Sequence, residues 1–261
     1  MILNLYKHDY KKMSKILNYM YVITLAFALV TRIVSIWENV KLIFIIKQVL
    51  AGFTIAGAVN IIVNTFVHIL KNVITSFYKD ESYLTHTLPV SKTQLLVSKY
   101  LSAITLVVVS VLVCFISLVT VYYSPETITM LKTLISATLL EFNMSVEAFI
   151  VMVVLLLLFQ TLALTTLSFV AIIKGYSYNE KRILFGLIWF FVIYIVSGIV
   201  MLIVSAIILA LQGNAHELLS ETISQQTFKT IVIVATVCYA LYSVVYFFTA
   251  NKLFNKGVNV D

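Results

Sequence analysis

The sequence predicts an all-α membrane protein with six transmembrane helices. Of its 261 residues, 61% are hydrophobic and only 11% are charged, whereas soluble domains are about 25% charged. Its mean hydropathy is +1.04. Several apolar stretches are about 20 residues long, which is the length that a helix needs to cross a bilayer. With only two prolines and seven glycines, the chain has little of the composition of a linker-rich protein.

An amphipathic segment opens the chain. Apolar residues recur at helical spacing, and the basic residues fall mostly on the other side; the apolar series is Leu3, Tyr6, Tyr10, Met13 and Leu17. We therefore expect residues 1–15 to form a helix lying in the membrane interface. A cleaved signal peptide is not expected, because charged and apolar residues are mixed and no cleavage site follows an apolar core.

Six apolar stretches are expected to be the spans, and together they predict one transmembrane domain over 1–261. They are 16–36, 43–70, 100–121, 149–173, 183–211 and 230–250. Ser124-Pro125-Glu126 starts a further amphipathic helix, expected at 125–141 and too polar to span. Gly175 is placed to end the fourth spanning helix and Asn179 to cap the next one.

The positions of the basic residues predict the orientation. With the N-terminus inside, thirteen of the 18 Lys and Arg residues fall on the inner side. Cytoplasmic loops carry such an excess, so both termini are expected in the cytoplasm of a multi-pass cell-membrane protein. The net charge of +7 is explained in this way, with membrane lipids rather than nucleic acid as partners.

The segment Phe77–Tyr100 is the main polar interruption between two spans. It cannot lie in hydrocarbon, so it is expected to be a cytoplasmic loop between the second and third spans. Pro89 interrupts the chain, and Ser91 with Gln94 forms a capping box that starts the next helix. The charged part, Lys79–Thr87, suits a short helix or turn that contacts another protein. An ordinary solvated loop is the alternative.

Several kinds of chemistry are not indicated by the sequence. Each Lys-Thr pair, at 92, 132 and 229, lacks the preceding glycine of a phosphate-binding loop. Glu81 and His86 are five residues apart, which is not the spacing of zinc ligands on a helix. The spans also hold almost no acidic residues. We expect no catalytic residues, no metal site and no cofactor in this chain, which is therefore not an enzyme.

Uncharged polar residues recur at helical spacing within two spans. They lie on one side of the second span with Gly57, and interrupt the apolar fifth span; they are Asn60, Asn64, His68, Tyr194 and Ser197. One interpretation is helix packing through hydrogen bonds worth about 1 kcal/mol each. The other is that they line a translocation path for an amphipathic or lipid-like cargo.

With an interfacial first helix, six spans and this loop, the chain resembles the permease subunit of a type-2 ABC exporter. The matching loop residues are Asp80, Glu81, Tyr83, Leu84, Leu88, Pro89, Val90, Ser91, Lys92, Leu95 and Lys99. The topology covers nearly the whole chain, and the motif covers about twenty residues. The helix expected at 125–141 departs from the most compact members.

The resemblance implies a dimer, of identical or related chains, that works with a separate ABC ATPase binding ATP and Mg²⁺. The first loop and the N-terminal helix would contact that ATPase, and the second and fifth spans would line the path. The implied coupling residues are Lys79, Asp80, Glu81, Tyr83, Leu84 and His86, followed by the motif residues Leu88, Pro89, Ser91, Lys92 and Lys99. The implied setting is the bacterial plasma membrane, with antimicrobial peptides, drugs or lipid-linked material as cargo and a role in resistance.

A different class of function remains open beside the exporter. A non-transporting membrane subunit for immunity or sensing would share the topology but need no ATPase. An embedded enzyme and a secondary carrier are less favoured, because neither a catalytic cluster nor an internal repeat is evident. Co-purification of an ATPase would separate the first two hypotheses.

Overall fold

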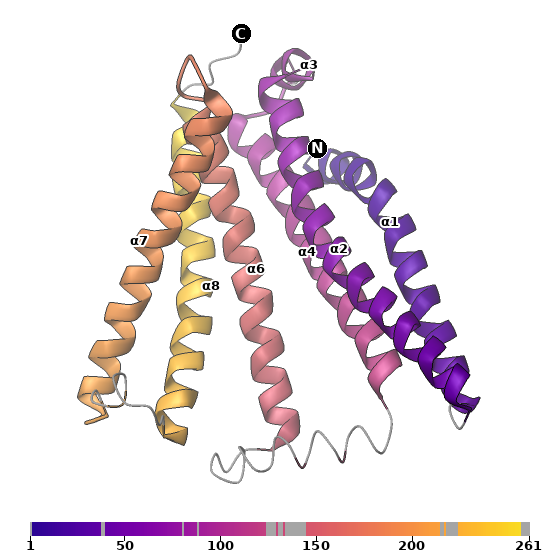
Figure 1. Ribbon diagram of the computed structural model, residues 1–261. Helices are drawn as coiled ribbons and strands as arrows, with labels where there is room; N and C mark the ends of the chain where they lie inside the picture. The colour runs from indigo at the N-terminus through magenta and orange to yellow at the C-terminus, as the bar shows by residue number, and fades with distance from the viewer. Residues whose placement is uncertain are drawn as a thin grey trace. The chain divides into compact units, whose positions relative to one another are not determined.

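A computed structural model describes residues 2–37, 40–79, 81–87, 89–123, 129, 133, 145–214, 217 and 224–256. Within these residues the regular structure is entirely helical (Figure 1). The elements are α1 (Ile2–Val34), the 3₁₀ turn η1 (Ser35–Trp37), α2 (Lys41–Tyr78), α3 (Ser82–Thr87), α4 (Lys92–Tyr122), α6 (Val146–Gly175), α7 (Arg182–Leu211) and α8 (Gln225–Asn255). The helix expected at 125–141 lies almost wholly outside the described residues.

Six of these helices are long and apolar enough to cross a membrane, namely α1 with η1, α2, α4, α6, α7 and α8. This confirms the predicted class of an all-α, multi-pass membrane protein. The helices extend beyond the predicted spans, since a helix can continue into polar residues at either end of its apolar stretch. In α1, the expected interfacial segment and the first span are one continuous helix, whose first turns run in a different direction from the rest (Figure 1).

The chain divides into two compact units, Met1–Ile128 and Thr129–Asp261. In the first unit, α1 packs along both α2 and α4, and α2 also packs against α4. Small residues allow the close approach: a Cβ atom on Gly57 of α2 would lie 2.7 Å from Thr24 Oγ1 of α1. Gly57 is therefore a packing residue between α1 and α2, as small residues often are between membrane helices.

Hydroxyl groups join all three long helices of the first unit. Ser110 Oγ of α4 lies 2.7 Å from Tyr21 Oη of α1. It also lies 2.7 Å from Thr65 Oγ1 of α2. Inside a helix bundle such bonds contribute about 1 kcal/mol each, and they are directional, so they fix the axial position of each helix against its neighbours.

In the second unit, α6 packs against both α7 and α8. Gly175 is the last residue of α6, as predicted, and a Cβ atom there would lie 2.6 Å from Gly186 Cα on α7. The prediction that Asn179 caps α7 was wrong. Lys181 holds that position with φ 49°, in the left-handed region, and its side chain makes no cap hydrogen bond.

Candidate functional site

The loop between α2 and α4 contains a short helix and a capped helix start. Helix α2 ends at Tyr78 and α3 occupies Ser82–Thr87. Ser91 Oγ then accepts a hydrogen bond from the Gln94 backbone N–H at 3.2 Å. Gln94 Oε1 accepts one from the Ser91 N–H, also at 3.2 Å. The predicted capping box is confirmed, and it gives α4 a defined first turn.

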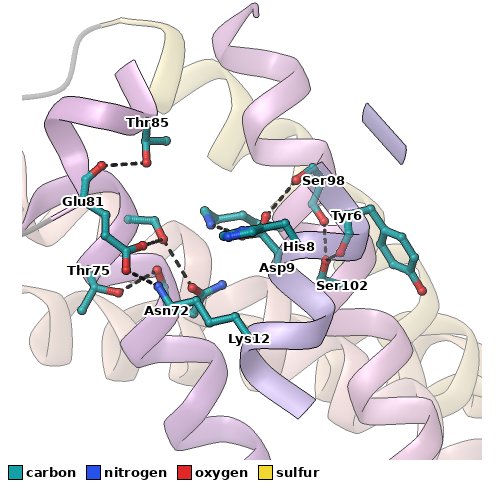
Figure 2. A network of polar contacts seen from close by, with 12 residues as sticks. Tyr6, His8, Asp9, Lys12, Asn72, Thr75, Glu81, Thr85, Ser98 and Ser102 are labelled. Atoms are coloured by element: carbon teal, nitrogen blue, oxygen red, sulfur yellow. Dashed lines mark hydrogen bonds and ion pairs between the residues drawn. The ribbon is translucent and has the colours of Figure 1, made fainter. Parts of the chain in front are cut away.

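Glu81 joins this loop to two long helices (Figure 2). Its carboxylate forms an ion pair with Lys12 of α1 and accepts a hydrogen bond from Ser76 Oγ of α2 at 3.2 Å. Its backbone N–H donates to the Thr75 carbonyl oxygen at 3.2 Å, and its own carbonyl accepts from Thr85 Oγ1 at 2.8 Å. Glu81 thus fixes α3 to the end of α2 and to the start of α1.

The Lys12 ammonium holds the pKa of the Glu81 carboxyl below its usual value. The hydrogen bond from Lys12 is the largest cause; partial burial opposes it, and the hydrogen bond from Ser76 supports it. The carboxylate is therefore ionised at neutral pH and keeps its ion pair.

A second ion pair is buried between α1 and α4. Lys99 Nζ donates to Asp9 Oδ1 at 2.8 Å, and Ser98 Oγ donates to Asp9 Oδ2 at 2.9 Å. Asp9 is 7% exposed and Lys99 is 4% exposed. Lys99 Nζ also lies 5.5 Å from the centre of the Phe77 ring at the end of α2. The charges are paired and hydrogen-bonded, as buried charges must be.

Further polar contacts extend the junction along α4. Ser102 Oγ donates to the Tyr6 carbonyl oxygen at 3.3 Å, and Tyr6 Oη donates to Thr105 Oγ1 at 3.2 Å. Figure 2 shows the contact between Ser102 and Tyr6 beside the two ion pairs. We call the whole set the polar network, made of Tyr6, Asp9, Lys12, Ser76, Glu81, Ser98, Lys99, Ser102 and Thr105.

One buried amide beside the polar network is incompletely bonded. Asn72 Oδ1 of α2 lies 3.3 Å from Ser76 Oγ, whose hydroxyl hydrogen the Glu81 carboxylate accepts. Asn72 Nδ2 has no hydrogen-bond partner within the part of the chain that the structure describes. Asn72 lies close to Lys12 and Glu81 (Figure 2), so the junction holds an unused donor next to its partly exposed ion pair.

The predicted coupling residues divide between the inside and the outside of the loop. Glu81 and Lys99 point inward to α1, whereas Tyr83 is 76% exposed and Lys79 is also exposed. Of the motif residues, Pro89, Ser91 and Lys92 are exposed. Asp80 and Leu88 lie outside the described residues, and Leu84 and His86 are placed in α3 by their backbone alone. The outward set forms the accessible surface of the loop.

Sequence reasoning missed Asp9 and Lys12 as partners of this loop. Asp9 is the only acidic residue among residues 1–37. It precedes Met13 and Leu17 by four and eight positions, and both of those are buried. An acid on the apolar face of an amphipathic helix requires a buried cation, so the position of Asp9 could have indicated a buried cationic partner without identifying it as Lys99.

The predicted path residues occupy two places. Asn60 is exposed and Asn64 is half-buried on α2; Asn64 Nδ2 donates to Asn60 Oδ1 at 2.6 Å and to its carbonyl oxygen at 3.0 Å. His68 is also half-buried. Tyr194 and Ser197 line a pocket of about 160 Å³ in the second unit. That pocket is lined by Ala163, Leu164, Leu167, Tyr194, Ile195, Ser197, Gly198, Met201, Tyr239, Tyr242 and Tyr246.

No protein-family model, curated protein or solved structure matches this chain. Among the described residues, no group of three His, Cys, Asp or Glu side chains is arranged to hold a metal ion. The features from which a function can be inferred are the polar network, the exposed surface of its loop and the polar positions within the spans.

Proposed function

We propose that this chain is the membrane permease subunit of an ATP-driven exporter of the type-2 ABC kind. It would act as a dimer, of identical or related chains, with a separate ATPase that holds ATP and Mg²⁺. The loop between α2 and α4 would lie in the cytoplasm and transmit movement from the ATPase. The cargo would be amphipathic: a peptide, a drug or a lipid-like molecule.

The polar network is the observation that carries this proposal. The ion pair of the loop itself, Lys12–Glu81, is partly exposed, and the buried pair Asp9–Lys99 lies between α1 and α4, where burying two charges costs several kcal/mol per ion before they attract one another. Here Glu81 fastens α3 to α1 and α2, while Asp9 and Lys99 fasten α1 to α4. A force applied to α3 therefore reaches all three long helices of the first unit.

The outward face of the loop supplies the matching contact surface. Tyr83 projects from α3 with 76% of its surface exposed, and Lys79 is exposed beside it. Tyrosine is enriched at protein interfaces because its ring is apolar and its hydroxyl is polar. We propose that the ATPase binds this face of the loop. Rigid movement of the helices would then open the path to one side of the membrane or to the other.

The polar pair on α2 is consistent with a path along that helix. The Asn60 side chain is exposed at a position well inside α2. Exposed amides in hydrocarbon are unfavourable, and the two hydrogen bonds from Asn64 Nδ2 to Asn60 do not use the donor of the Asn60 amide. Water or a polar cargo in a dimer path would satisfy that donor.

The test is coupling to an ATPase encoded beside this chain. Tyr83→Ala should lower cargo-stimulated ATP hydrolysis about tenfold while leaving the protein inserted and the polar network intact. Tyr123→Ala is the matched control, since Tyr123 is similarly exposed but follows the other end of α4. Unchanged coupling in Tyr83→Ala would refute the loop assignment. A stable, functional chain that never binds an ATPase would instead favour the immunity or sensor subunit.

A further inference from the structure

The pocket of the second unit is built by one face of each of three helices. Helix α8 contributes Tyr239, Tyr242 and Tyr246, at spacings of three and four residues. Helix α7 contributes the series Tyr194, Ser197, Gly198 and Met201, which also repeats at helical spacing. Helix α6 closes the pocket with apolar side chains, Ala163, Leu164 and Leu167. The lining is apolar apart from four tyrosines and one serine.

The tyrosine hydroxyls differ in their hydrogen bonding. Tyr242 Oη donates to the Ser197 carbonyl oxygen at 2.8 Å, so its proton is used within the protein. Tyr246 is only 9% exposed, and its hydroxyl has no hydrogen-bond partner within the described residues. The Ser197 hydroxyl, which also lines the pocket, donates to the Ile193 carbonyl oxygen at 2.8 Å.

A buried hydroxyl without a partner carries a cost of about 1–3 kcal/mol. Among apolar walls, a ligand with a hydrogen-bond acceptor would remove that cost. The pocket size limits the ligand further. Its volume of about 160 Å³ is close to that of an engineered protein cavity of about 150 Å³ that binds benzene. The stacked rings of Tyr242 and Tyr246, with centres 5.9 Å apart, offer an aromatic surface of matching size.

We propose that this pocket binds an uncharged apolar group about the size of a benzene ring that carries one carbonyl or ester oxygen, and that Tyr246 donates its hydroxyl hydrogen to that oxygen. The group could belong to a membrane glycerolipid, through its ester, or to a free small molecule. The site lies within α6, α7 and α8 and does not depend on the proposed ATPase partner.

The test compares two probes of nearly equal shape, acetophenone and ethylbenzene, which differ in the carbonyl oxygen. Dissociation constants are measured by ligand-detected NMR on the purified full chain in detergent, with protein-free micelles subtracted. The wild type should bind acetophenone about fivefold more tightly than ethylbenzene, the effect of one neutral hydrogen bond. Tyr246→Phe should bind both probes equally. Tyr242→Phe should keep the preference, because its hydroxyl is already engaged.

A second pair of variants tests the pocket itself. Gly198 lines the pocket and a Cβ atom there meets nothing within 4 Å, so Gly198→Leu should occupy the pocket and weaken both probes at least tenfold. Gly52→Leu is the control, since Gly52 of the first unit is equally open and is not in the pocket. A carbonyl preference that survives Tyr246→Phe would overturn the proposal, as would normal probe binding by Gly198→Leu.

Native mass spectrometry identifies the source of the group. If a glycerolipid supplies it, the wild type should carry one lipid that acetophenone displaces and that Gly198→Leu lacks. If a free molecule supplies it, the two proteins should carry the same lipids and differ only in probe binding. These measurements contain no ATPase, so their failure would leave the proposed exporter function unaffected.

Discussion

Removing one charge of the buried Asp9–Lys99 pair should destabilise the first unit strongly. In Lys99→Met, the Asp9 carboxylate stays buried at 7% exposure; it keeps the hydrogen bond from Ser98 Oγ at 2.9 Å and the His8 imidazole 3.9 Å away, but loses its buried counter-ion. Breaking a buried ion pair in this way costs about 3–5 kcal/mol. That is a large part of the 5–15 kcal/mol by which a typical protein is stable. Asp9→Asn should cost a similar amount, because Lys99 then lacks its counter-ion.

The double variant Asp9→Leu with Lys99→Met separates charge pairing from packing. Replacing both charges by apolar groups removes the desolvation cost along with the attraction, so stability should return to within about 1 kcal/mol of the wild type. The Ser98 hydroxyl loses its acceptor in that variant, and it can turn to a backbone carbonyl of its own helix. Because each single change costs about 3–5 kcal/mol and the double variant about 1 kcal/mol or less, a double-mutant cycle should give a coupling free energy of at least about 5 kcal/mol.

The measurement is reversible unfolding of the purified chain in mixed micelles with increasing SDS. Lys12→Met provides the control, because the Lys12–Glu81 pair is partly exposed and such pairs contribute only about 0–1 kcal/mol. If Lys99→Met were as stable as Lys12→Met, or if the double variant were no better than its parents, the buried pair would not be the contact that holds α1 on α4.

Three further predictions follow from the same unit. Lys12 lowers the Glu81 pKa below its ordinary 4.5. The ion pair therefore stabilises the loop fully above pH 4.5, and this stability is lost as the pH falls through the lowered pKa. Glu81→Gln should flatten this acid dependence in unfolding experiments. Gly57→Ala should cost about 1–3 kcal/mol by forcing Thr24 aside, whereas Gly52→Ala should not destabilise. Ser91→Ala should lose about 1 kcal/mol and increase amide exchange in the first turn of α4.

The spans were predictable because they depend on a single property, the length of an apolar stretch. The start of α4 was predictable for a similar reason, since the capping box of Ser91 and Gln94 involves residues close in sequence. The cap of α7 was not: the sequence favoured Asn179, but the chain turns at Lys181 with a left-handed backbone. There the close contact of Gly175 with Gly186 sets the path of the turn, and that contact is tertiary.

The candidate site was only half predictable, because its partners are far apart in sequence. The loop motif drew attention to Glu81 and Lys99, but both residues turn inward to α1. Their partners Lys12 and Asp9 lie 69 and 90 residues away. No local pattern pairs charges at that distance. Tyr83, Lys79 and their exposed neighbours form the outward surface of the loop. The resemblance implies that an ATPase binds there.

The separations of the bonded residues show what the polar contacts add to helix packing. Asp9 and Lys99 are 90 residues apart, and Tyr21 and Ser110 are 89 apart. These bonds fix α1 against α4 at two separate levels of α4, at Lys99 with Asp9 and at Ser110 with Tyr21. Apolar contacts alone allow helices to slide with little loss, whereas a misplaced ion pair leaves two buried charges unpaired. Movement of α3 would therefore carry α1 and α4 together rather than shift one along the other, and a device that transmits force requires this stiffness.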